Sequence, residues 1–309
     1  MPVENCDVLI VGAGPAGLTA AVYLARYRRK VLVVHDGASR AARIPLTHNV
    51  PGFPGGIAGP DLLRQMREQA ELYGAVLRQD EIQTLAHDEE EGFAAQGAHS
   101  RYRAASVILA TGVRLNQIDL PEADHEDAIC SACLRYCPIC DGYEATGKRV
   151  AVLGSSTHGA REALFLRHYS KHLTLLTREG CELSDAQRRE LATAGVEVLD
   201  APVAAFRPGP QAMEVELSDG RRLTFDVLYP ALGASPRSEL AAQLGLTLSE
   251  GGCIPTDACQ RLPIPGLFAA GDVVEALDQI SVAIGHGAIA ATQAHNFLRE
   301  REGRVLQAE

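Results

Sequence analysis

Two cysteines separated by two residues stand near the middle of this 309-residue chain, in the stretch Cys137-Pro138-Ile139-Cys140-Asp141-Gly142. The Cys-x-x-Cys spacing lets two sulfurs open and close a disulfide without large backbone movement. Asp141 directly follows the second cysteine, so a carboxyl group is available to give or take the proton that dithiol chemistry requires. The stretch predicts a thiol–disulfide redox site with Cys137, Cys140 and Asp141 as its catalytic residues.

A glycine-rich turn near the start of the chain predicts a dinucleotide site. Gly12-Ala13-Gly14-Pro15-Ala16-Gly17 follows an apolar strand and opens a helix. In this context the first glycine permits a tight turn, the second lets the backbone approach a pyrophosphate, and the third allows close packing of helix and strand. The pyrophosphate then lies at the N-terminus of the helix. Asp36, at the end of the next strand, can accept a hydrogen bond from a ribose hydroxyl.

A second strand end carries another candidate ligand. The apolar segment Phe268-Ala269-Ala270 runs into Gly271-Asp272. A carboxylate presented where a strand ends can accept hydrogen bonds from the ribityl chain of FAD. A helix-capping aspartate is the alternative interpretation of Asp272.

The hydrophobic periodicity predicts an α/β protein with two βαβ openings. We expect strands over 6–11, 31–34, 106–110, 149–153, 173–177 and 267–270. We expect helices over 61–74, from the turn that follows 149–153 through residue 168, and over about 287–299. The acidic run at 88–91 is interpreted as a solvated hairpin tip. No low-complexity linker separates the two βαβ openings, and together they predict two nucleotide-binding domains.

Composition narrows the class of protein. The formal net charge of -10, without a basic block, argues against a nucleic-acid partner. Residues 8–25 are nearly all apolar, but their glycine-rich interruption favours a buried strand and helix over a membrane span. The first residues lack the basic flank of a secretory signal, and four of the eight cysteines fall within 130–140. These features predict a cytoplasmic protein with one specialised sulfur site.

Short motifs follow one another along nearly the whole chain. They are Gly12-x-Gly14-x-x-Gly17, His48-Asn49-Val50-Pro51-Gly52-Phe53, Ala110-Thr111-Gly112, Cys137-x-x-Cys140-Asp141-Gly142, Gly233-Ala234-Ser235-Pro236 and Ala269-Ala270-Gly271-Asp272. In this set and order the chain resembles the low-molecular-weight thioredoxin reductase family. The resemblance implies two Rossmann-like nucleotide-binding domains, the second inserted in the first. The FAD-binding domain would comprise 1–116 and 247–309, and the nicotinamide-type domain, which carries the Cys-x-x-Cys motif, 117–246.

The same resemblance implies roles for individual residues. The expected cofactor-binding residues are Gly12, Gly14, Ala16, Gly17, Asp36, Asn49, Ala110, Thr111, Gly112, Gly271, Asp272 and Gln279. Cys140 matches the sulfur that faces the flavin, Cys137 the sulfur that exchanges with the partner disulfide, and Asp141 the proton donor. The family also implies a homodimer and a thioredoxin-like protein or small disulfide as partner.

Two departures from the family concern the electron donor. The second glycine-rich turn has Ser156 in place of its middle glycine, and a side chain there crowds a pyrophosphate. Where the family has His-Arg-Arg-x-x-x-Arg, this chain reads Thr177-Arg178-Glu179-Gly180-Cys181-Glu182-Leu183. Glu179 would repel the 2′-phosphate of NADPH and suits a free 2′-hydroxyl instead. We therefore expect NADPH to be a poor donor and NADH a better one, with ferredoxin or a second flavin as further possibilities.

Other interpretations of the cysteine-rich stretch stay open at this stage. Cys130 and Cys133 lie outside the family pattern, and the spacing C-x2-C-x3-C-x2-C is also compatible with a zinc or iron–sulfur site. A non-catalytic protein that binds a metal through four cysteines, or senses redox state with them, is the alternative of another class. A flavin-dependent dithiol oxidase is the alternative on the same scaffold, although such enzymes tend to carry histidine in place of Asp141. No metal is expected, because a structural metal would block the redox sulfurs.

His286, before the last predicted helix, is interpreted as a capping residue or as a tuning group near the flavin.

Overall fold

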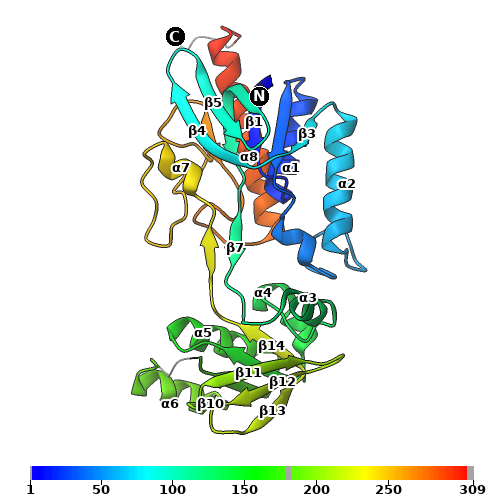
Figure 1. Cartoon of the computed structure of the whole chain (residues 1–309), viewed down its shortest axis with the longest axis vertical. Helices are drawn as coiled ribbons and strands as arrows, with labels where there is room; N and C mark the ends of the chain where they lie inside the picture. The colour runs from blue at the N-terminus through cyan, green and yellow to red at the C-terminus, as the bar shows by residue number, and fades with distance from the viewer. Residues whose placement is uncertain (1, 179–181, 305–309) are drawn as a thin grey trace. The chain divides into compact units, whose positions relative to one another are not determined.

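The computed structural model describes residues 2–178 and 182–304, and its contacts divide the chain into two compact units (Figure 1). Unit 1 comprises Met1–Ala42, Ile57–Arg114 and Ser235–Glu309. Unit 2 comprises Arg43–Gly56 and Leu115–Ala234. Unit 2 is thus mostly an insertion in the sequence of unit 1, together with a short segment from the N-terminal third of the chain. Strands β7 (Val113–Leu115) and β15 (Ala234–Pro236), which pair with each other, lie where the chain passes from one unit to the other.

Unit 1 is built on a seven-stranded sheet in the order β3-β2-β1-β6-β5-β4, with β16 paired to β6. The strands are β1 (Val3–Val11), β2 (Val31–His35), β3 (Val76–Gln79), β4 (Ile82–Asp88), β5 (Gly92–Gly97), β6 (Arg101–Leu109) and β16 (Leu267–Ala269). β1 runs parallel to β2 and β6, and β16 runs parallel to β6. β4 and β5 form an antiparallel hairpin whose tip holds the acidic run, as the sequence predicts. The carboxyl ends of β1, β2 and β16 therefore lie along one edge of the sheet, which is where doubly wound sheets bind ligands.

The helices of unit 1 pack closely against this sheet and each other. They are α1 (Pro15–Arg26), the 3-10 turn η1 (Arg40–Arg43), α2 (Gly59–Leu72), α7 (Glu239–Gln243) and α8 (Ile280–Arg301). A β-carbon added at Gly287 of α8 would come within 2.3 Å of the carbonyl oxygen of Ala16, so glycine there lets α8 approach α1. The prediction that the last helix begins near Gly287 is wrong by about two turns: α8 begins at Ile280, and Gly287 is a packing position inside the helix.

Unit 2 has a parallel sheet and a small antiparallel one. The parallel sheet has the order β10-β9-β8-β14, and the antiparallel sheet has the order β11-β12-β13. Its elements are α3 (Glu122–Cys130), α4 (Pro138–Asp141), η2 (Tyr143–Ala145), β8 (Arg149–Leu153), α5 (Thr157–Leu166), β9 (His172–Leu176), α6 (Asp185–Thr193), β10 (Val196–Leu199), β11 (Val203–Pro208), β12 (Met213–Leu217), β13 (Arg222–Phe225) and β14 (Val227–Pro230). The predicted second βαβ unit is β8-α5-β9. Both units thus have the α/β architecture with parallel strands that the sequence predicts.

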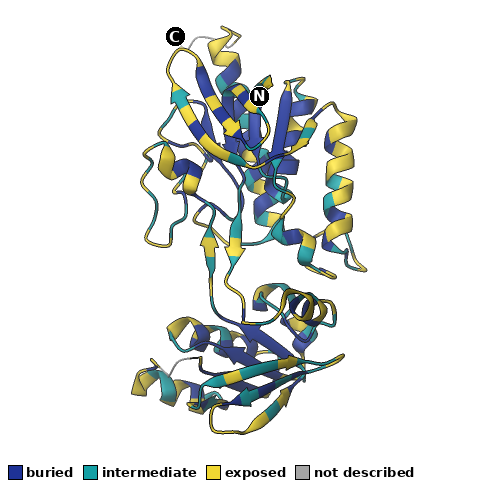
Figure 2. Ribbon diagram, in the orientation of Figure 1, coloured by how far each residue is buried: buried dark blue, intermediate teal, exposed yellow. Residues whose placement is uncertain are grey.

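Burial follows the strand pattern in each unit. The central parallel strands are almost fully buried, while α2 exposes most of its length (Figure 2). Strands β1, β2, β8 and β9 each contain four consecutive buried residues, because both faces of a parallel sheet are covered. In the described part of the chain, no helix is both long and apolar enough to span a membrane.

Candidate active site

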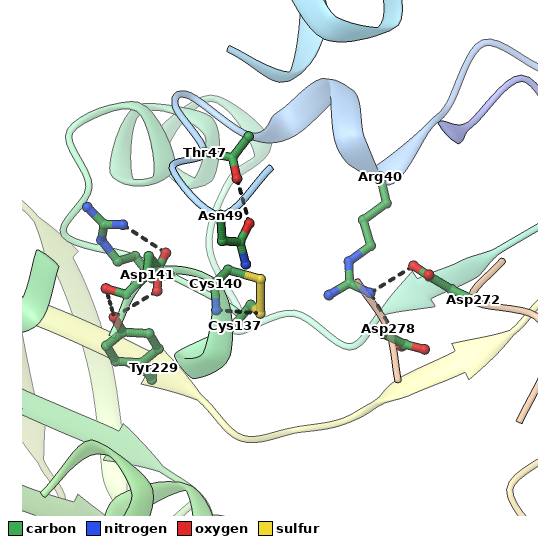
Figure 3. Close-up of a disulfide and its surroundings, with 10 residues drawn as sticks. Arg40, Thr47, Asn49, Cys137, Cys140, Asp141, Tyr229, Asp272 and Asp278 are labelled. Atoms are coloured by element: carbon green, nitrogen blue, oxygen red, sulfur yellow. Dashed lines mark hydrogen bonds and ion pairs between the residues drawn. A yellow bond between two sulfur atoms is a disulfide. The ribbon is translucent and has the colours of Figure 1, made fainter. Parts of the chain in front are cut away.

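Cys137 and Cys140 form a disulfide at the start of the four-residue helix α4 in unit 2 (Figure 3). Their Cα atoms are 5.2 Å apart. Cys137 is the N-cap of α4: its sulfur accepts a hydrogen bond from the backbone N–H of Cys140 at 3.1 Å. Pro138 occupies the first helical position, where the missing N–H costs no hydrogen bond. Between the two cysteines, Ile139 exposes 51% of its surface.

The carboxyl group of Asp141 is held by two donors. Arg135 Nη1 donates to Oδ2 at 2.8 Å, and the Tyr229 hydroxyl donates to Oδ1 at 2.8 Å (Figure 3). Burial raises the pKa of this carboxyl, while the arginine and the tyrosine act in the opposite direction. The structure thus places a partly desolvated acid directly after Cys140. Sequence reasoning missed both Arg135 and Tyr229, because nothing in the Cys-x-x-Cys pattern points to them.

Gly142 ends α4 and permits the tight turn behind the disulfide. A β-carbon at this position would lie 2.6 Å from the carbonyl oxygen of Pro138 and 2.8 Å from the ring of Tyr169. Any side chain would therefore displace the backbone that carries the redox pair. The glycine of the Cys-x-x-Cys-Asp-Gly motif is explained by packing alone.

Asn49 lies in the segment that unit 2 takes from the N-terminal third of the chain. Its Oδ1 accepts a hydrogen bond from the buried Thr47 hydroxyl at 2.9 Å, which fixes the amide, and Figure 3 draws it with the disulfide. Two ion pairs tie the same segment to unit 2: Arg43 with Glu126 at 2.8 Å, and His48 with Glu144 at 2.9 Å. The structure therefore brings Asn49 together with the redox helix in unit 2.

The first glycine-rich turn has the packing that the dinucleotide fingerprint requires. Gly12 has a φ of +112°, and a β-carbon there would lie 2.2 Å from the carbonyl oxygen of Ala110. A β-carbon at Gly17 would lie 1.9 Å from the carbonyl oxygen of Gly12. Gly14, in contrast, has only the Ser39 hydroxyl within reach, at 3.5 Å. The first and third glycines are thus needed by the fold, whereas the second faces open space at the N-terminus of α1.

Asp36, directly after β2, is already paired within unit 1. Its Oδ2 accepts from Arg237 Nη2 at 2.5 Å, and its Oδ1 accepts from the backbone N–H of Ala38 at 2.9 Å. Burial alone would raise the pKa of this carboxyl, but these bonds lower it, so the group is ionised. Arg237 also binds the predicted Ala110-Thr111-Gly112 turn: the Thr111 hydroxyl donates to its carbonyl, and its N–H donates to the carbonyl of Gly112. Sequence reasoning missed this arginine, which lies 201 positions from Asp36.

Asp272 follows β16 and faces an arginine. Arg40 Nη1 contacts Asp272 Oδ2 at 3.2 Å and Asp278 Oδ2 at 3.4 Å (Figure 3). Burial raises the pKa of Asp272, and burial together with the charge of Asp272 raises the pKa of Asp278 to about 6. Gly271, with a φ of +81°, approaches Ala16 closely, since a β-carbon there would lie 2.9 Å from the Ala16 β-carbon. The glycine turn and the Gly-Asp strand end therefore meet in unit 1.

The N-terminus of α8 differs from the expectation for His286. Gln279 is the N-cap residue of α8, and His286 lies inside the helix, so the capping interpretation of His286 is wrong. The His286 Nδ1 atom is buried and has no hydrogen-bond partner within the described residues. Burial lowers the pKa of its imidazole, and the charge of Asp272 opposes that shift.

The second glycine-rich turn is packed like the first, but the side chain of Ser156 caps the helix that follows it. A β-carbon at Gly154 would lie 2.8 Å from the Cα atom of Gly159, so these two glycines serve helix–strand packing. Ser156 is the N-cap of α5 and accepts from the backbone N–H of His158 at 3.4 Å. Leu183, which stands at the last basic position of the family pattern, is buried in the core of unit 2. Glu179 lies outside the described residues.

The four clustered cysteines do not share one environment. Cys133 is fully buried, and its sulfur lies 3.6 Å from the carbonyl oxygen of Ala128. Cys130 is exposed at the end of α3. Among the residues that the structure describes, no group of three or more His, Cys, Asp or Glu side chains is arranged to hold a metal ion.

Comparison with known proteins settles the family. A family model described as pyridine nucleotide-disulphide oxidoreductase matches residues 6–287. The chain belongs to this family. It is a flavin-dependent thiol–disulfide oxidoreductase of the low-molecular-weight thioredoxin reductase type, as its motifs predict.

Relatives of known function support this assignment over the whole chain. The thioredoxin reductase of Streptomyces coelicolor is 33% identical over 94% of this chain and 94% of its own length. The thioredoxin reductase of Peptoclostridium litorale is 31% identical over 95% of this chain and 97% of its own length. Among solved structures, the thioredoxin reductase of Streptococcus pyogenes superposes with a TM-score of 0.87 at 27% identity, over 96% of this chain and 99% of its own.

Proposed function

We propose that this protein is an FAD-dependent disulfide reductase that passes electrons through the Cys137–Cys140 pair to a thioredoxin-like disulfide. The observation that carries the proposal is the disulfide itself: it spans a Cys-x-x-Cys motif followed by a held acid, in a chain of this family. Bound FAD supplies the pair of electrons that opens the disulfide. Cys137 and Cys140 are then a thiolate and a thiol.

We assign unequal roles to the two sulfurs. Cys140 is the flavin-facing sulfur and Cys137 the exchanging one. The Cys137 thiolate attacks one sulfur of the partner disulfide and forms a mixed disulfide, and the partner's other sulfur leaves with the bonding electron pair. Cys140 then attacks the Cys137 sulfur, which re-forms the enzyme disulfide and releases the second partner sulfur. Asp141 manages the proton of this second step.

The residues of unit 1 support the FAD assignment. The N-terminus of α1 has no capping side chain among the described residues, and Gly14 leaves room beside it, so its free N–H groups suit a pyrophosphate. We propose that Gly12, Gly14, Ala16, Gly17 and Asp36 bind the adenosine and pyrophosphate part. We assign the flavin and ribityl part to the remaining predicted residues of unit 1, which are Ala110, Thr111, Gly112, Gly271, Asp272 and Gln279. Asn49, which is also predicted to bind this part, belongs to unit 2. We retain 1–116 with 247–309 as the FAD-binding domain and 117–246 as the nicotinamide-type domain.

The donor and the partner follow from the family in general terms. Pyridine nucleotide-disulphide oxidoreductases use FAD and a nicotinamide nucleotide. We propose that NADPH is a poor donor here, because Ser156 closes the second glycine turn and Leu183 is buried where a basic residue would bind phosphate. We also propose a cytoplasmic homodimer whose partner is thioredoxin-like.

A test of the function needs no knowledge of the natural donor. The purified protein, reconstituted with FAD, is reduced with dithionite without oxygen and mixed with excess oxidised bacterial thioredoxin. We expect stoichiometric flavin absorbance and the appearance of thioredoxin thiols, detected by alkylation and mass spectrometry. A protein that takes up no FAD, or that never reduces thioredoxin, refutes the proposal. If the reduced enzyme fails with thioredoxin but oxidises dithiols when air is admitted, a dithiol oxidase is favoured.

A further inference from the structure

The acid beside the redox disulfide is held by two residues, Arg135 and Tyr229, that lie outside the motifs identified in this sequence. Arg135 Nη1 lies 2.8 Å from Asp141 Oδ2, and the Tyr229 hydroxyl lies 2.8 Å from Oδ1 and 3.2 Å from the Asp141 carbonyl oxygen. Tyr229 is fully buried, and the side chains of Arg135 and Asp141 expose only 16% and 19% of their surface. These contacts are far less screened than a surface ion pair.

The backbone of unit 2 fixes the arginine and the tyrosine next to each other. Leu134 forms a parallel bridge with Leu228 of β14: the N–H of Arg135 donates to the carbonyl of Leu228 at 3.0 Å, and the N–H of Leu228 donates to the carbonyl of Cys133 at 2.8 Å. Arg135 Nε also donates to the carbonyl of Ala132 at 3.3 Å. Arg135 is thus held both by its backbone N–H and by its guanidinium Nε. The buried Cys133 belongs to the segment that pairs with β14.

Both oxygens of the Asp141 carboxyl group act as acceptors in this arrangement. An ionised carboxylate accepts at both oxygens and keeps further lone pairs free, whereas a protonated carboxyl must donate from one of them. The geometry therefore favours the anion while the disulfide is closed. We propose that Arg135 and Tyr229 are positioning residues that keep Asp141 ionised, so that it acts as the proton acceptor for Cys140 in disulfide exchange.

The proposal rests on the proposed function and assigns one step of it. When the mixed disulfide between Cys137 and the partner has formed, the Cys140 thiol gives its proton to the Asp141 carboxylate. The Cys140 sulfur attacks the Cys137 sulfur, the enzyme disulfide forms, and the partner's sulfur leaves with the electron pair of the broken bond. Asp141 then gives the proton to that leaving thiolate and returns to its ionised state. No further oxidant or reductant is required.

The charged and titratable groups around Asp141 act in opposite directions. Burial raises the pKa of the Asp141 carboxyl above its ordinary value and the charge of Glu144 adds to this, whereas Arg135 and the Tyr229 hydrogen bond lower the pKa and so oppose protonation. Glu144 Oε1 is paired with His48 at 2.9 Å, while its Oε2 is buried without a hydrogen-bond partner among the described residues. Removing Arg135 or Glu144 must therefore shift the titration of Asp141 in opposite directions.

The pH dependence of thioredoxin reduction by the pre-reduced, FAD-loaded enzyme tests the proposal. Because the carboxylate is the active form, the rate falls as the pH drops through the pKa of Asp141. In Arg135→Met this acid limb moves to higher pH, by about 1–3 units, which is the usual effect of an arginine beside an aspartate. In Arg135→Lys the charge is retained, and the limb stays near its wild-type position. Arg149→Met, which removes a 2.8 Å ion pair with Asp226 on the exposed surface of unit 2, is the matched control and leaves the profile unchanged.

Two further variants keep the test decisive if Arg135→Met folds poorly. Tyr229→Phe removes one hydroxyl and moves the acid limb to higher pH, while Glu144→Gln moves it to lower pH. If these variants lower the rate equally at every pH, or if Lys at position 135 behaves like Met, the two residues are structural and the proposal is wrong. A wild-type enzyme that transfers nothing to thioredoxin would instead refute the proposed function.

Discussion

At the level of single residues, the four cysteines between positions 130 and 140 have distinct surroundings. Cys137 and Cys140 are joined, Cys133 is buried in the core of unit 2, and Cys130 is exposed. Sulfur reactivity depends on access and on stabilisation of the thiolate, so the buried Cys133 is poorly suited to exchange with a partner. The contribution of Cys133 is to packing and to the backbone that carries Arg135.

Single substitutions of the redox pair should separate the roles of its sulfurs. Cys137→Ser leaves Cys140 without its partner, and we expect a thiolate–flavin charge-transfer band in the oxidised enzyme together with loss of thioredoxin turnover. Cys140→Ser should abolish turnover without the band. Visible spectra of the two variants, recorded against pH, check this. A band in Cys140→Ser alone would reverse the assignment of the two sulfurs.

The upstream pair should affect stability rather than chemistry. Cys133→Ser places a hydroxyl in a fully buried site, and an imperfectly paired polar group costs about 1–3 kcal/mol, so the thermal midpoint should fall. Cys130→Ser, at an exposed position, is the control and should leave the midpoint unchanged. The double variant, assayed well below its midpoint, should retain most of its thioredoxin turnover. A double variant as inactive as Cys137→Ser would show that the four cysteines form one functional unit.

At the level of elements, the two glycine-rich turns begin helices with different N-termini. The turn before α1 leaves open space at Gly14, and no described side chain caps the helix. The turn before α5 carries Ser156, whose hydroxyl accepts from the backbone N–H of His158. In both turns the outer glycines are needed for packing. The middle position alone therefore decides whether the helix N-terminus is available to an anion.

Gly14→Ala tests this difference in unit 1. The new methyl group meets only the Ser39 hydroxyl, at 3.5 Å, so the apoprotein should fold normally. A pyrophosphate lying against that backbone would be displaced, and overpacking of about 1–3 kcal/mol corresponds to roughly 5- to 150-fold weaker FAD binding. Flavin fluorescence titration of the apoprotein measures the affinity, with Gly251→Ala as a control in open surroundings. Unchanged affinity would show that the pyrophosphate lies elsewhere.

The elements also show which parts of the site could be predicted from the sequence. The βαβ units were predictable, because buried parallel strands and glycine turns leave local patterns. Arg237 on Asp36 and Tyr229 on Asp141 were not, since these pairs join residues 201 and 88 positions apart. The start of α8 was misplaced because a glycine required for packing against α1 resembles a helix break in a single sequence.

At the level of the whole molecule, each unit carries one half of the expected chemistry. Unit 1 holds the dinucleotide turn and the Gly-Asp strand end, and unit 2 holds the disulfide, its acid and the altered second turn. Within unit 2, the ion pairs Arg43–Glu126 and His48–Glu144 join residues 83 and 96 positions apart, so no local pattern could reveal them. We expect the altered second turn to determine which electron donor the enzyme accepts.

The donor preference of the enzyme should follow from Ser156 and the missing phosphate contacts. Each lost charge-assisted contact is worth about 1.5–3 kcal/mol, so NADPH should bind at least tenfold more weakly than in a site with a full arginine set. NADH lacks the 2′-phosphate and should reduce the flavin faster than NADPH at equal concentration, though the serine still obstructs its pyrophosphate. Anaerobic rapid mixing of each nucleotide with the oxidised enzyme measures both rates.

The substitution Ser156→Gly tests whether the serine side chain obstructs nucleotide binding at the second turn. Ser156→Gly removes the side chain that caps α5 and opens the approach to its N–H groups, at a cost in helix stability of only a few tenths of a kcal/mol. We expect faster flavin reduction by NADH in this variant, because the pyrophosphate can then bind at the helix N-terminus. Ser218→Gly makes the same substitution at an exposed position in the turn between β12 and β13, and should leave the rate unchanged. Rapid reduction of the wild-type flavin at micromolar NADPH would show that other basic residues serve the phosphate. If both nucleotides fail in the wild type and in Ser156→Gly, the donor is of another class, and reduced ferredoxin and a second reduced flavin are the candidates for the same rapid-mixing measurement.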